Sequence, residues 1–236
     1  MKPRLACTTL LFSTLGSHGF AAPTGLNTIP TTDLVQLSNW IFGVQNGNVS
    51  FTGTPFYRMP AWIGQSQYGV SSLVEAGVDY FQTPDTLHNV AVFNAKALLM
   101  AEDDTHPNIA AGVLNVAPGQ APSYYVTLSK TLNYDQQQEE RFKAHHRRNR
   151  KLLGRRAHVG LMLDGKGILQ PFTGTDLQIS ESLVFQADWI NGSGNATTAG
   201  LSYVLPDQKT VLTPALLLSN DTHRLGFSLS LTRQFP

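Results

Sequence analysis

The sequence predicts an all-β fold: an antiparallel transmembrane β-barrel of about 10–12 strands with short turns and one long basic loop. Three observations predict it. Apolar and polar residues alternate along most of the chain beyond residue 30. Gly, Pro, Asn and Asp interrupt this alternation at intervals that suit chain reversals. The alternating segments are about 9–12 residues long, enough to cross a bilayer at a tilt, whereas soluble strands more often have about 5 or 6.

Composition fits one globular or barrel domain. The chain has 236 residues, of which 42% are hydrophobic and 14% are charged. It is too apolar to be disordered, and beyond the N-terminus it has no apolar run of about 18 residues that could form a spanning helix. Cys7 is the single cysteine, so the chain can form neither an internal disulfide nor a cysteine-based metal site.

The first 21 residues have the three parts of a secretory signal. Two basic residues stand in the first four, an apolar stretch covers 5–15, and small residues around Gly19 and Ala21 suit cleavage. The signal therefore spans 1–21 and the barrel domain spans 22–236. Cys7 leaves with the signal, which suits an oxidising compartment.

The expected strands follow one another with short connections, so we expect an antiparallel meander rather than parallel units with helical crossovers. Turn signals separate them at 69–72, 103–107, 117–122, 191–195 and 206–209. In chain order, the expected strands cover residues 34–44, 49–58 (the weakest), 60–69, 72–82, 89–101, 108–116, 124–132, 157–164, 183–190, 198–205, 210–219 and 225–235.

One face of each expected strand is apolar and the other is polar or small. Between Ser72 and Gln82, for example, Val74 and Val78 alternate with Glu75 and Asp79, and successive strand side chains point to opposite faces. In a membrane barrel the polar face lines the lumen. The predicted lumen-facing polar residues are Glu75, Asp79, Asn94, Lys96, His158 and Asp188.

Two of these residues form an expected ion pair. Glu75 and Lys96 lie on the same face of neighbouring strands, where opposite charges stabilise a sheet. Glu75 and Asp79 also stand four residues apart on one face and suggest a carboxylate pair, but the pairing with Lys96 is the simpler interpretation.

The period-two pattern also suits a second fold, a soluble secreted or periplasmic β-sandwich that binds a ligand. Aromatic residues such as Tyr80, Trp189, Tyr203 and Phe235 stand near segment ends, where the rings of a membrane barrel lie at headgroup level. In a sandwich the same rings would belong to the core. Segment length favours the barrel.

Three stretches carry a resemblance to known proteins: residues 25–32 after the signal, the hairpin 67–80, and residues 187–192 followed by 200–203. In these stretches the chain resembles bacterial outer-membrane β-barrel proteins, and more narrowly a group of porin-like exported proteins. The resemblance implies a location in the cell outer membrane, outer-membrane lipids as partners, and a porin-like or structural envelope role. A narrow pore for small solutes is the corresponding hypothesis.

The closing segment, Leu225 to Phe235, looks like the aromatic-ended last strand that the barrel-insertion machinery of such proteins recognises. The resemblance therefore implies that machinery as a partner, acting through the Phe235 segment. The sequence departs from the pattern at its end, because Pro236 follows the aromatic residue.

Residues 133–156 break the alternation and carry a net charge of +5. We expect a solvated basic loop inserted in the barrel domain. Its cations could bind anionic lipid headgroups, each contributing about 1 kcal/mol near a membrane surface. Nucleic acid is not expected in an exported protein without interleaved aromatic residues, and His145-His146 lacks the carboxylates of a metal site. The candidate headgroup-binding residues are Arg141, Lys143, Arg147, Arg148, Arg150, Lys151, Arg155 and Arg156.

The sequence predicts neither an enzyme nor a cofactor. It has no phosphate-binding glycine loop, no metal-spaced histidine cluster and no nucleophile elbow. A third hypothesis remains open, in which His158 and a lumen or rim serine form the His and Ser arrangement of a lipid-modifying barrel enzyme.

Overall fold

The computed structural model describes Leu26 and residues 28–50, 62–82, 89–119, 121–132, 155–180, 182–192 and 195–236. The expected signal, residues 1–21, lies outside the described residues. So does the basic loop up to residue 154. No helix in the described ranges is both long and apolar enough to cross a membrane.

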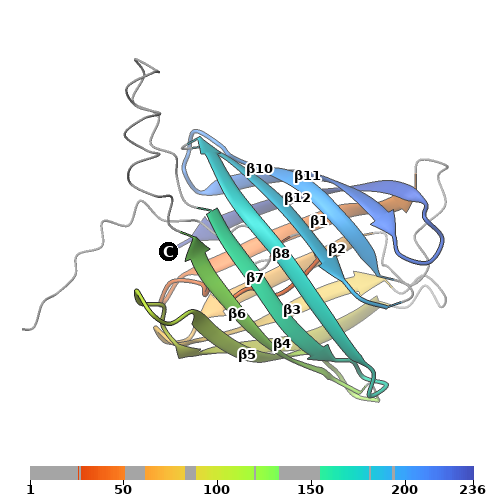
Figure 1. Ribbon diagram of the computed structural model, residues 1–236, viewed down its shortest axis with the longest axis horizontal. Coiled ribbons are helices and arrows are strands. Elements are labelled where there is room, and N and C mark those ends of the chain that lie inside the picture. Colours follow the sequence, from red (N-terminus) through yellow and green to blue (C-terminus); the bar gives the residue numbers. More distant parts are fainter. Residues whose placement is uncertain are drawn as a thin grey trace, which may run out of the picture.

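Twelve antiparallel strands close into a barrel, in which each strand pairs with its neighbours in sequence and β12 returns to pair with β1 (Figure 1). This confirms the predicted fold class, and the sandwich alternative is wrong because the sheet has no open edge. The strands are β1 (Trp40–Ser50), β2 (Trp62–Gly69), β3 (Val74–Gln82), β4 (Asn89–Met100), β5 (Asn108–Val116), β6 (Ser123–Leu132), β7 (Arg155–Leu163), β8 (Leu169–Ser180), β9 (Leu183–Ile190), β10 (Ala196–Val204), β11 (Thr210–Ser219) and β12 (Leu225–Phe235).

The expected strand positions are confirmed except at three places. β8 was not predicted. The strand expected over 34–44 begins only at Trp40, and Leu34 and Val35 lie inside the barrel instead. The weak candidate over 49–58 contributes only its first two residues, to the end of β1, and its remainder lies outside the described residues.

The barrel is apolar outside and polar inside. In β12, Phe227, Leu229 and Leu231 are exposed on the outer surface, whereas Ser228 and Thr232, on the alternate positions, are buried in the lumen. The same inversion recurs in β6 and β10. A barrel surrounded by lipid needs this arrangement, because lipid replaces water at its outer surface.

Aromatic rings gather at the rim that holds the C-terminus. The ring centroid of Trp40 lies 4.6 Å from that of Tyr68, and that of Phe42 lies 5.6 Å from that of Phe235. This rim, called the C-terminal rim below, also holds the turn between β2 and β3 and the ends of β6 and β7 that flank the basic loop. Tyr80 and Tyr124 are exposed toward the opposite rim.

Candidate functional site

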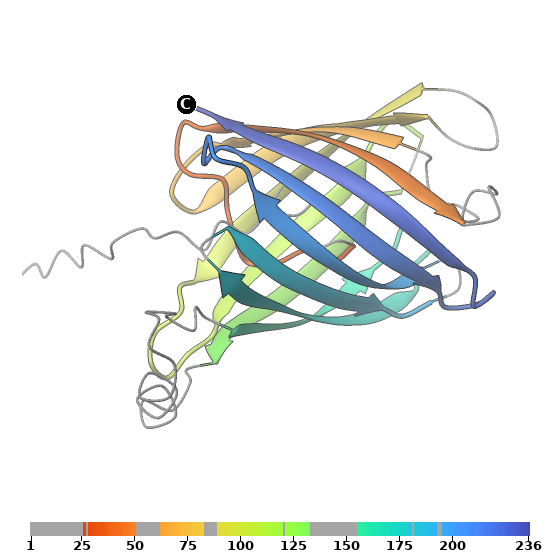
Figure 2. The same ribbon diagram turned by 90° about the horizontal axis from the view of Figure 1, so that it is seen from above.

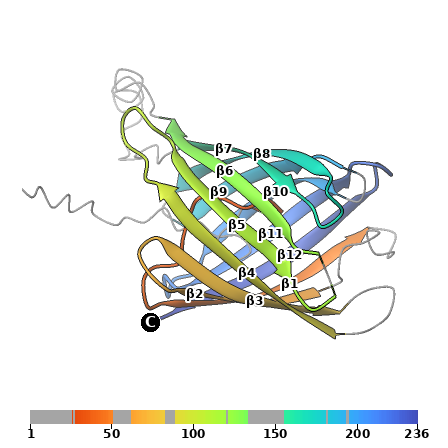
Figure 3. The same ribbon diagram turned by 90° about the horizontal axis from the view of Figure 1, so that it is seen from below.

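A stretch of chain ahead of β1 lies inside the barrel. Leu26 and residues 28–35, called the lumenal segment below, run within the lumen toward the C-terminal rim, where the chain turns into β1 (Figures 2 and 3). Several of its side chains are as buried as those of a protein core: Ile29 is 2% exposed, Thr31 1% and Val35 2%. The lumen is therefore occupied by the protein's own chain.

The inner end of the lumenal segment is held by apolar packing. Leu26 and Ile29 pack in one cluster with Tyr125, Met162, Phe172 and Ile190 of the wall. Gly174 of β8 makes room for them, since a Cβ atom there would lie 2.5 Å from Leu26 Cδ1 and 2.7 Å from Ile29 Cδ1. A small side chain at this position would fit only if the ends of the Leu26 and Ile29 side chains shifted, and a larger one would compete with the segment for the same space.

Wall side chains hold the rest of the segment by bonding its backbone. The Val35 N–H donates to Glu75 Oε2 (2.7 Å), and Lys96 Nζ donates to the Thr31 carbonyl (3.1 Å). Further contacts join the Thr28 N–H and hydroxyl to Asp188, the Thr32 N–H to Ser129 Oγ and the Thr127 hydroxyl to the Pro30 carbonyl. Because these bonds come from side chains, the segment is not a strand of the sheet.

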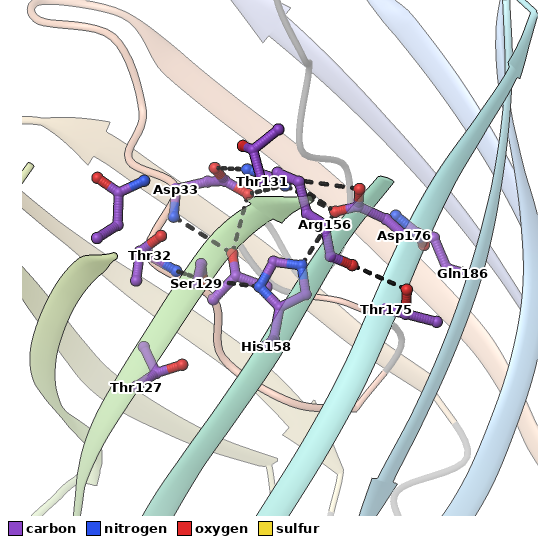
Figure 4. Close-up of polar contacts among 12 residues, drawn as sticks. Thr32, Asp33, Thr127, Ser129, Thr131, Arg156, His158, Thr175, Asp176 and Gln186 are labelled. Atoms are coloured by element: carbon purple, nitrogen blue, oxygen red, sulfur yellow. Dashed lines mark hydrogen bonds and ion pairs between the residues drawn. The ribbon is translucent and has the colours of Figure 1, made fainter. Parts of the chain in front are cut away.

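Arg156 makes the strongest polar contact with the segment (Figure 4). Its Nη1 and Nη2 donate to the two carboxylate oxygens of Asp33 at 2.6 and 2.7 Å. Its Nε and Nη2 also donate to Asp176 Oδ2 at 3.0 and 2.8 Å. The guanidinium thus joins the segment to the wall through two carboxylates, the geometry in which arginine binds most strongly.

A serine, a histidine and an aspartate continue this network along three neighbouring strands. His158 Nδ1 lies 2.7 Å from Ser129 Oγ, and His158 Nε2 lies 3.1 Å from Asp176 Oδ2 (Figure 4). The three residue types match a hydrolase triad. However, His158 is fully buried in the lumen under the segment, on the side of the wall that faces away from lipid.

The predicted ion pair between Glu75 and Lys96 is confirmed, with 3.3 Å between Oε1 and Nζ and both side chains almost fully buried. Among the other residues predicted to face the lumen, Asn94 is buried there and accepts the Asn115 N–H. Asp188 is buried against the segment. Asp79 shares the face of Glu75 and lies opposite Gln65 of β2.

The prediction that Arg156 binds lipid headgroups is wrong. Arg156 belongs to β7 rather than to the loop, and strand alternation turns its side chain inward to Asp33 and Asp176. Arg155, one residue earlier, is exposed. The other candidate residues, Arg141, Lys143, Arg147, Arg148, Arg150 and Lys151, and the His145-His146 pair lie outside the described residues.

Sequence reasoning missed the lumenal segment and three residues of the site: Asp33, Ser129 and Asp176. Asp176 lies in the strand that was not predicted, and Asp33 lies just before the strand expected over 34–44, in a stretch to which no strand was assigned. Ser129 carried a usable signal, since it stands on the polar face of a predicted strand and pairs in register with His158.

Little space remains beside the segment. A cavity of about 40 Å³ lies among Pro30, Gln67, Glu75, Lys96 and Tyr125, room for about one water molecule. Within the described part of the chain, no group of three or more His, Cys, Asp or Glu side chains is placed to hold a metal ion.

Comparisons with known proteins locate the fold. The sequence matches no protein-family model and no curated protein. Among solved structures, the KdgM porin superposes with a TM-score of 0.51 at 8% identity, over 84% of this chain and 99% of that one. The KdgM porin in complex with disordered oligogalacturonate gives the same score at 7% identity, with the same coverage. A mutant of the Rh. blastica porin gives 0.39 at 11% identity, over 74% and 55%. The likeness to the KdgM porin shows a shared barrel fold.

Proposed function

We propose that this protein is an outer-membrane, porin-like β-barrel with a narrow pore for small solutes, and that the lumenal segment closes the pore in the state described. The observation that carries the proposal is the inverted polarity of the barrel, with an apolar outer surface around a lumen lined by serine, threonine, glutamine and charged side chains. The fold shared with the KdgM porin supports it.

The way the segment is held favours a removable closure. Its chain joins the sheet at the rim, where Leu37, just after the segment, forms an isolated bridge with Gly69. Inside the lumen its contacts are apolar packing and bonds from wall side chains. The segment can therefore leave while all twelve strand pairings of the wall stay intact.

The proposal covers location and partners. Exposed Leu, Val and Phe side chains on the outer surface fit the acyl chains of outer-membrane lipids. Delivery to that membrane would use the signal of residues 1–21 and recognition of the Phe235 segment by the barrel-insertion machinery. Arg155, at the start of β7, and the basic residues of the loop before it remain candidates for contact with anionic headgroups. Arg156 is no longer among them.

We also propose that the protein is not an enzyme. A lipid-modifying barrel would need its serine and histidine accessible to lipid, and Ser129 and His158 instead face the lumen. Ser129 is 1% exposed and already accepts the Thr32 N–H. In this arrangement the two residues orient Asp176 and Arg156.

The test is to lock the segment to the wall. A Cβ atom at position 174 would lie 2.5 Å from Leu26 Cδ1, so cysteines placed at the two positions would face each other. Oxidation should join them, which mass spectrometry confirms before conductance is recorded, and the mature chain would have no cysteine of its own. In planar bilayers, Leu26→Cys/Gly174→Cys should show no channel openings when oxidised. Reduction should restore the openings of the wild-type chain.

The single variants Leu26→Cys and Gly174→Cys are the matched controls, and reductant should not change their conductance. If the oxidised double variant conducts as freely as the reduced one, the segment does not close the pore. The small size of the remaining cavity favours a second candidate, a structural envelope protein that never opens. Conductance equal to that of a bare bilayer, for every variant in both redox states, would favour that candidate.

A further inference from the structure

We propose that Arg156 is a carboxylate-binding site in the wall of the lumen, that Asp33 occupies it in the closed state, and that the carboxylate of a small organic acid occupies it when the segment leaves. The inference deepens the proposed function by naming the class of solute. It rests on that function for its role in transport, but the binding itself can be tested without a pore.

Asp33 stands in the site as a bound solute would. Its two oxygens accept from two different nitrogens of Arg156, in the fork that matches a planar carboxylate. The aspartate belongs to the removable segment, whereas the arginine belongs to the wall. Asp33 is also the more exposed partner, with its side chain 21% exposed against 10% for Arg156.

The wall holds the guanidinium of Arg156 in place without Asp33. Arg156 Nε and Nη2 both donate to Asp176, and Asp176 is in turn bonded to His158 (Figure 4). The backbone carbonyl of Arg156 accepts from the Thr175 hydroxyl. When Asp33 leaves, Nη1 and one side of Nη2 face the lumen in a fixed orientation, so a new carboxylate meets a preorganised site.

The charged groups around the Arg156 guanidinium favour a ligand with one carboxylate. In the wall, Arg156 is paired with Asp176 and Lys96 is paired with Glu75. His158 of β7 lies between Ser129 of β6 and Asp176 of β8. Asp33 adds a single negative charge to this balanced set. A monocarboxylate reproduces that charge and shape, whereas a cation would be repelled by the guanidinium and a neutral acceptor would lack the charge that Asp33 supplies.

Chemical rescue tests the site in the full chain. Asp33→Ala removes a group of the size of formate from the slot beside Arg156 and leaves the segment in place. Formate added to the folded variant in detergent should raise its midpoint of thermal unfolding, with saturation, because it binds only the folded state. Sodium chloride at the same ionic strength should not.

Asp33→Asn is the matched control, because its amide fills the slot without the charge, and formate should not shift its midpoint. Asp33→Ala/Arg156→Met should also lose the response. If Asp33→Ala folds poorly, its refolding yield with and without formate gives the same readout.

An equal response of Asp33→Ala and Asp33→Asn, or none in Asp33→Ala by either readout, would overturn the inference. The assay needs no membrane, so its outcome is independent of conductance. If formate stabilises Asp33→Ala but the protein never conducts, the carboxylate site is supported and the proposed pore is wrong.

Discussion

Arg156 is the residue on which the closed state depends most. Among the residues that the structure describes, it alone is a cation bonded to both Asp33 and Asp176, and its side chain is 10% exposed. Buried ion pairs add little net stability when both partners are present, yet removing one partner is costly because the other charge stays buried without compensation. The arginine should therefore matter more for stability than either aspartate alone.

Arg156→Met should lower the free energy of unfolding by about 3 kcal/mol or more. Adding Asp33→Asn to this variant should recover a substantial part of the loss, since it removes one of the two carboxylates left without a cation. Urea-induced unfolding of the refolded barrel in detergent micelles measures both. If the double variant is less stable than Arg156→Met, Asp33 is not paired with Arg156.

For single residues, the sequence predicted those contacts that follow from the alternation of side chains along paired strands. Glu75 and Lys96 were predicted as a pair because two neighbouring strands with period-two faces bring them together. Asp33 and Arg156 are 123 residues apart, and Asp33 lies on no strand. No local pattern links such a pair, so it could be found only once the path of the segment was known.

At the scale of elements, β8 shows why alternation alone can fail. Its outer face carries Pro171, Thr173 and Thr175, whereas the large apolar side chain of Phe172 points into the lumen. Between Phe172 and Thr175 the usual polarity of the two faces is therefore reversed, and proline and glycine are usual strand breakers. The strand forms because its neighbours on both sides supply a complete ladder.

The lumenal segment escaped sequence analysis for a related reason. Its apolar residues, Leu26, Ile29, Leu34 and Val35, follow no period of two, and it bonds to side chains rather than to a neighbouring backbone. Its position depends on space in the wall, which Gly174 supplies. A need for space between residues far apart in the sequence produces no periodic pattern that sequence analysis could detect.

Gly174→Val should expel the inner end of the segment and leave the barrel folded. The new side chain overlaps Leu26 and Ile29, while valine itself is favoured in strands. Expulsion should make the chain susceptible to cleavage before Asp33 by a protease specific for aspartate, to which the wild-type segment is protected by burial.

Gly43→Val is a suitable control. It also adds a side chain in the lumen, but its nearest contacts are Thr232, Gln65 and Leu231 rather than the segment. Equal protection of Asp33 in both variants, with the barrel intact, would show that the segment does not rest on Gly174.

On the scale of the whole molecule, the barrel separates two environments. The outer surface exposes large apolar side chains along its strands, with aromatic rings toward both rims, and the polar side chains point inward to the segment and to one another. The sequence predicted this architecture well, because fold class, strand count and facing all follow from period-two alternation and segment length.

An arginine on the outer surface should be costly at mid-height and tolerated at the end of the strand. Leu229→Arg, near the middle of β12, should cost about 2–4 kcal/mol of stability in lipid vesicles, and Leu225→Arg, at the start of the same strand, about 0–1 kcal/mol. Unfolding titrations in vesicles compare the two variants. Equal, negligible costs would indicate that this surface faces water.

The central claim is that the twelve strands form a closed barrel in a membrane. The most direct test is the migration of the membrane-extracted protein on an SDS gel, unheated against boiled. A closed barrel has no free edge at which detergent can begin to separate the strands, so the account predicts that the unheated protein migrates as a distinct band that boiling shifts. Identical migration before and after boiling, with the protein recovered in the soluble fraction, would contradict it.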